Sequence, residues 1–178
     1  MKFLKNLFKG ELQNERFVEE YNGISIRGSQ QFIDRTKPAL DLLESSKSFQ
    51  EIKGYIRIVG EGLTSGMHAE SEYPTFEVGN STSSANPKWY ASCIAHDTYH
   101  SKLYKEGQSL GLTGNELRRH WTGRTSESKC LSFQKQVLVE IEANNGEIEY
   151  INKLIKNPHV DNEDYTYSDY LSRMSQEF

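Results

Sequence analysis

Apolar residues alternate in the middle of the chain and follow helical spacing on either side of it. Tyr55–Val59 alternates and is β-branched, and Thr75–Val78 has a similar short pattern, so both segments are expected to be strands. Upstream, Thr36–Leu43 has helical spacing, with Thr36 as its cap and Pro38 in its first turn. This order of helix, strands and further helices predicts an α+β fold in which a small twisted sheet packs on helices.

Long helices are expected after the strands. The first begins at Asn86, which can cap free amides, with Pro87 at the first helical position and Gly107 as the residue that stops it. The expected ranges are 86–105, 126–144 and 147–156, with a short helix over 115–120 in the loop between the first two.

Composition narrows the class of protein. The chain has 178 residues, which favours one domain over 1–178. Lys and Arg number 21 and Asp and Glu 25, so the net charge is −4, which argues against nucleic-acid binding. The mean hydropathy is −0.72, and no apolar run approaches the roughly 18 residues of a membrane span. The sequence predicts no oligomeric state.

The ends of the chain and the cysteines add further expectations. Residues 1–28 are expected to form an N-terminal helical extension. Within it, residues 1–10 are expected to be a docked or frayed helix or, as the alternative, a helix on a membrane surface. Residues 158–178 form an acidic, Tyr-rich tail. Cys93 and Cys130 are too few for a disulfide scaffold, so a reducing, cytoplasmic location is expected.

Two histidines provide the first candidate chemistry. His96 and His100 are four residues apart in the helix that begins after Asn86, so they point the same way and can bind one metal ion. Mostly apolar residues precede them, and buried imidazoles need a partner, which a metal ion supplies. The alternative is that both are hydrogen-bonded core histidines.

The next helix supplies a third candidate ligand. Glu127 and Gln134 lie on its apolar stripe, where an unpaired acid is costly, so Glu127 is expected to complete the site and Gln134 to orient it. Stabilisation of the helix N-terminus is the alternative role of Glu127. Glu140 lies on the opposite face and is a poorer candidate. Two histidines and one glutamate leave a fourth position open, as in catalytic zinc sites.

These motifs resemble those of the zincin metallopeptidases of the gluzincin type. The likeness rests on His-x-x-x-His in one helix and on Ser126–Cys130, a glutamate with a small residue three positions later, in the next. It covers about residues 88–143. The resemblance implies a zincin-like fold, a zinc site between two consecutive long helices at the base of a cleft, and hydrolysis of a peptide or protein substrate.

The chain departs from the family pattern at one position. Asp97 follows the first histidine, where the family has glutamate, and is the expected general base. Its shorter side chain withdraws the carboxylate by about 1.5 Å, so a specialised hydrolase or a metal-binding protein without activity is also compatible. His120 is expected to lean into the cleft and stabilise a developing oxyanion, with a loop histidine exposed to water as the alternative.

Two other functions fit parts of the sequence. His96-Asp97 also resembles the metal pair of HD-type phosphohydrolases, with His68 and either Asp161 or Asp164 as further ligands, but that fold is all-helical. In the second alternative, the chain is a non-catalytic interaction or immunity-type protein in which the metal only joins two helices.

Overall fold

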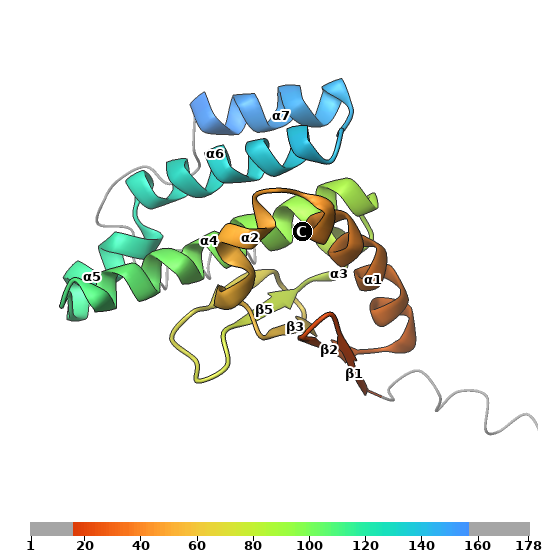
Figure 1. Cartoon of the computed structure of the whole chain (residues 1–178), viewed down its shortest axis with the longest axis horizontal. Coiled ribbons are helices and arrows are strands. Elements are labelled where there is room, and N and C mark those ends of the chain that lie inside the picture. Colours follow the sequence, from red (N-terminus) through yellow and green to blue (C-terminus); the bar gives the residue numbers. More distant parts are fainter. Residues whose placement is uncertain (1–15, 157–178) are drawn as a thin grey trace, which may run out of the picture.

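A small mixed sheet forms the base of the fold, and helices cover one of its faces (Figure 1). The computed structural model describes residues 16–156. The strand order is β1-β2-β3-β5-β4, in which β2, β3 and β5 are parallel and the edge strands β1 and β4 are antiparallel to their neighbours. The strands are β1 (Phe17–Tyr21), β2 (Ile24–Gly28), β3 (Ile58–Glu61), β4 (Gly66–His68) and β5 (Thr75–Val78).

The core lies between the sheet and the helices. Side chains alternate between the two faces of a strand, and those on the helix-facing side are almost fully buried, as Ile26, Val59 and Phe76 show. The helical elements are α1 (Gln30–Ser45), α2 (Phe49–Ile52), the 3₁₀ turn η1 (Lys53–Tyr55), α3 (Asn80–Ser83), α4 (Pro87–Ser109), α5 (Gly114–Thr122), α6 (Arg124–Glu140) and α7 (Asn145–Lys156).

Helix α4 runs through the middle of the molecule. It contacts α1 and the strands β4 and β5 on one side and α6 on the other, and α7 covers α6 (Figure 1). Asn86 caps α4 as expected, because its side chain accepts hydrogen bonds from the amides of Lys88 and Trp89. The α+β prediction is therefore confirmed, and α4 lies between the sheet with α1 on one side and α6 on the other.

Several predicted boundaries differ from the structure. β5 has the expected bounds, whereas the strand expected over Tyr55–Val59 begins three residues later because η1 occupies residues 53–55. Helix α1 starts earlier than expected, since Ser29 is its cap and its hydroxyl accepts a hydrogen bond from the amide of Phe32. Thr36 is therefore not a cap, and Pro38 lies inside the helix.

The predicted helical extension over residues 1–28 is wrong for residues 17–28, which form the hairpin β1–β2. Its turn, Asn22-Gly23, has φ values of +50° and +80°, as a type I′ turn requires. Residues 1–15 and 157–178, which include most of that extension and the acidic tail, lie outside the described residues. Within residues 16–156, no helix combines the length and apolarity needed to cross a bilayer.

Helix α4 continues past Gly107, contrary to the prediction, and ends at Ser109. This glycine instead allows α5 to pack closely on α4. A Cβ atom at Gly107 would lie 2.6 Å from a methyl group of Leu117 and 2.9 Å from the ring of His120, both on α5. The contact between these helices explains the glycine better than helix termination does.

Candidate metal centre

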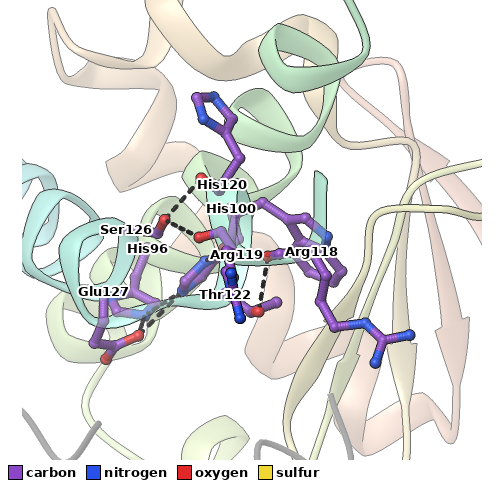
Figure 2. Close-up of polar contacts among 9 residues, drawn as sticks. His96, His100, Arg118, Arg119, His120, Thr122, Ser126 and Glu127 are labelled. Atoms are coloured by element: carbon purple, nitrogen blue, oxygen red, sulfur yellow. Dashed lines mark hydrogen bonds and ion pairs between the residues drawn. The ribbon is translucent and has the colours of Figure 1, made fainter. Parts of the chain in front are cut away.

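Helix α4 brings the two predicted histidines together. Their Nε2 atoms are 3.2 Å apart, and both face α6. From α6, Oε2 of Glu127 lies 3.3 Å from Nε2 of His100 and 3.7 Å from Nε2 of His96 (Figure 2). The side chains of His100 and Glu127 are 2% and 6% exposed, while that of His96 is 14% exposed. The group is thus buried between two helices, and His96 is its most exposed member.

These distances match the shell of a metal ion. Ligands that bind zinc at about 2.0–2.1 Å in a tetrahedron lie about 3.3–3.4 Å from one another. The three measured distances, 3.2, 3.3 and 3.7 Å, lie close to this value. His96, His100 and Glu127 therefore form a group that could hold a metal ion, with one nitrogen or oxygen atom from each residue.

A backbone carbonyl sets the orientation of His100. Because α5 ends at Gly123, its last carbonyl groups are available to side chains, and that of Trp121 accepts a hydrogen bond of 2.6 Å from Nδ1 of His100. The proton on Nδ1 leaves the Nε2 lone pair of neutral His100 directed at the other two residues. This partner is not among the residues predicted from sequence, although Gly123 marks the helix end that frees the carbonyl.

The junction of α5 and α6 is held by side-chain hydrogen bonds to the backbone. The hydroxyl of Ser126 donates to the carbonyl of His120 at 2.7 Å and to that of Arg119 at 3.3 Å, and the hydroxyl of Thr122 donates to Arg118 (Figure 2). Ser126 immediately precedes Glu127. These bonds therefore link the placement of the carboxylate to the helix that supplies the carbonyl partner of His100.

The environment of the group shifts the pKa values of His100 and Glu127. Burial alone would lower the pKa of His100, but the hydrogen bond and charge of Glu127, with the charge of Asp97, raise it. Burial would raise the pKa of Glu127, yet the charge of His96 and hydrogen bonds from both histidines hold it well below its usual range. Either a proton on an Nε2 atom or a metal ion can bridge these three facing atoms.

Asp97 lies beside this group but is not one of its three members. It is 8% exposed, and its charge helps to raise the pKa of His100. Burial is the largest cause of the raised pKa of the Cys130 thiol, and the charge of Asp97 adds to it. Its carboxylate is therefore within electrostatic range of both helices. Both cysteines, Cys93 and Cys130, are free thiols, as predicted.

The structure does not bring His120 into the group. Its ring points away from His96 and Glu127 (Figure 2), packs against Gly107 and lines a separate cavity with Tyr55. The prediction that His120 leans toward the metal site is therefore not supported by its position. The reason is the close packing of α5 on α4, which the sequence pattern does not reveal.

Other candidate residues also have different partners. Gln134 donates to the hydroxyl of Ser92 at 3.1 Å and to Sγ of Cys93 at 3.8 Å, so it links α6 to α4 without contacting Glu127. His68 lies on β4 and is 3.2 Å from Glu77. The phosphohydrolase alternative loses support, because the described fold contains a sheet.

Glu140, the poorer candidate, has a role at the other end of α6. It accepts hydrogen bonds from the amide and hydroxyl of Ser48, at 2.9 and 2.8 Å. Burial would raise the pKa of Glu140, but these bonds lower it. Glu140 thereby joins the start of α2 to α6 and takes no part in the metal centre.

Replacing Glu140 by Ala is expected to lower the free energy of unfolding by about 1 kcal/mol at pH 7, because charge-assisted but partly exposed hydrogen bonds are lost. The lowered pKa means that this contribution exists above the unfolded pKa of about 4.3 and disappears as pH falls through the folded value. Urea denaturation at several pH values measures it. Glu149→Ala, an exposed site on α7, is the control, and equal losses in both variants would contradict the prediction.

Comparison of the chain with protein-family models, with curated proteins and with solved structures finds no match.

Proposed function

We propose that the chain is a zinc-dependent, hydrolase-like protein whose metal ligands are His96, His100 and Glu127. The close approach of their three acceptor atoms, at 3.2, 3.3 and 3.7 Å, carries this proposal. Two imidazoles and one carboxylate leave a fourth position, which is typical of catalytic zinc. A nitrogen-rich set favours zinc, although the carboxylate is also compatible with manganese or iron.

Zinc and Asp97 have different roles in the proposed chemistry. A bound zinc ion supplies a Lewis acid that polarises a carbonyl group and lowers the pKa of water. Asp97, next to His96 on α4, is proposed to accept the proton of the attacking water and to deliver it to the leaving group. The zincin resemblance makes a peptide or protein the proposed substrate. A cytoplasmic location remains a prediction from the two free thiols.

Variants of Asp97 test this function. Asp97→Asn is expected to retain one zinc ion per chain and to hydrolyse a peptide library about 10²–10⁴-fold more slowly, because the proton acceptor is lost while the ligands remain. Asp97→Glu restores the longer reach and is expected to raise the rate. Zinc content by mass spectrometry and product formation are measured on the same samples. Unchanged hydrolysis in Asp97→Asn would remove Asp97 from the mechanism.

A second candidate function is supported by the burial of the site. Since His100 and Glu127 are 2% and 6% exposed, a metal ion between α4 and α6 would also suit a non-catalytic interaction or immunity-type protein. Water exchange at bound Mn²⁺, measured by proton relaxation, distinguishes the two. Rapid exchange supports the enzyme, whereas a site without an exchangeable water supports a metal that only joins the helices.

A further inference from the structure

A cationic surface lies at the junction of α5 and α6. Arg119, Arg124 and Lys129 are exposed around Thr125, and we refer to these four residues as the α5–α6 surface. Two cavities, of about 730 and 260 Å³, meet there, since Thr125 and Lys129 line both. Within the described part of the chain, no ion pair joins Arg124 or Lys129 to an acid. The surface therefore presents cationic groups next to concave space.

The larger cavity also carries aromatic side chains. Tyr99 and Phe133 lie in its lining, with ring centroids 4.5 Å apart. Its one acidic lining residue, Glu51, is bound by Lys102 at 2.9 Å. A segment that combines negative charge with aromatic residues would therefore complement this surface.

The chain itself contains such a segment in residues 157–178. It has five acidic residues and one basic residue, so its net charge is −4, equal to that of the whole chain. It also has three closely spaced tyrosines. The acidic residues are Asp161, Glu163, Asp164, Asp169 and Glu177, the basic residue is Arg173, and the tyrosines are Tyr165, Tyr167 and Tyr170.

The course of α7 brings this segment to the surface. Helix α7 runs back along α6 and ends at Lys156 over the N-terminal half of α6 (Figure 1), where Ile155 shares an apolar cluster with Leu131. Arg124 lies seven residues before Leu131, which is about 10 Å along a helix. The five residues from Lys156 to Asp161 can span up to about 17 Å. The first acidic residues can therefore reach Arg124 and Lys129.

We infer that residues 157–178 dock on the α5–α6 surface, with Asp161, Glu163 and Asp164 against Arg124 and Lys129 and the tyrosines in the larger cavity. This contact is independent of the proposed metal chemistry. Because its charged groups are exposed to solvent, the stability of this contact depends on salt concentration.

Zero-length carbodiimide cross-linking of the full chain, followed by peptide mass spectrometry, tests the inference. The expected products join Lys129 to Asp161, Glu163 or Asp164 within one chain, and they disappear at 1 M salt, where the Debye length is about 3 Å. Lys47 is the control, because it is exposed and adjoins Ser48, which contacts Glu140 at the other end of α6. A mixture of isotopically labelled and unlabelled chains separates links within a chain from links between chains.

A charge exchange provides the second test. Replacing the three tail acids by Lys is expected to abolish the link. Combining that change with R124E and K129E is expected to restore a link, now between Glu at position 129 and the new tail lysines. Links of equal yield to Lys47, links only between chains, persistence at 1 M salt or no link at all would each overturn the inference. An exclusive link between chains would instead identify a second copy as the occupant of the surface.

Discussion

Replacing His96 by Ala is expected to abolish stoichiometric zinc binding. The variant removes the nitrogen that lies 3.2 Å from Nε2 of His100 and 3.7 Å from Oε2 of Glu127. Two ligands then remain, and the loss of affinity should exceed the roughly 10–100-fold that removal of an outer hydrogen-bond partner costs. Zinc per chain by mass spectrometry and affinity by competition with a chromophoric chelator measure the effect.

His68→Ala is the matched control for this experiment. His68 is also a partly buried histidine with a carboxylate partner, but its partner is Glu77 on β5, outside the metal group. It should retain one zinc ion with unchanged affinity. Circular dichroism of the metal-free proteins shows whether each variant is folded. If folded His96→Ala kept one zinc per chain at the affinity of the original chain, the ligand assignment would be wrong.

Zinc is expected to stabilise the fold by joining α4 to α6. At a free concentration of 100 times its dissociation constant, a ligand that binds only the folded state adds about 2.7 kcal/mol to the free energy of unfolding. For a chain of this size, that corresponds to a rise in Tm of about 5–11 °C. Thermal unfolding with zinc and with excess chelator measures the difference, and His96→Ala should show no such rise.

This stabilisation is expected to grow as pH rises from about 5.5 to 8. Zinc needs a neutral imidazole, and the carboxylate of Glu127 raises the pKa of His100 despite burial, so protons compete with the metal below and near that pKa. The raised pKa has the opposite effect on the metal-free protein. In the metal-free protein, the contribution of His100 to the free energy of unfolding is complete below the unfolded pKa of about 6.5 and is lost as pH rises through the folded value.

The gap in Tm between zinc-loaded and chelator-treated protein should therefore widen with pH. Glu127 does not change this direction over the same range, because its pKa is held far below it. A gap that stays constant with pH, or an equal gap in His96→Ala, would be incompatible with zinc binding at these histidines.

Most of the proposed site could be predicted from sequence because its main elements are local. The Asn86 cap and Pro87 start α4, and the spacing of His96 and His100 then places both imidazoles on one side of it. Glu127 could be singled out because an acid stood on the apolar stripe of α6, and the structure buries it against both histidines. Such patterns depend only on helical periodicity.

The parts of the fold that were missed depend on pairing between distant segments or on weak local signals. Strand β4 is only three residues long and exists because it pairs with β5. The hairpin β1–β2 carried a local signal in Asn22-Gly23, but its strands are short and follow a segment with helical spacing. Short strands are stabilised by their partners, so their own sequences specify them poorly.

By itself, the sequence determined the α+β class, the start of α4, and a histidine pair with one acid on the next long helix. Only the tertiary structure decided that the carbonyl of Trp121 orients His100, that Gln134 bonds Ser92, and that His120 packs against Gly107. The physical reason is that helical periodicity is set by neighbours within four residues. Contacts between helices depend instead on how closely their backbones approach, and this distance results from the packing of the whole core.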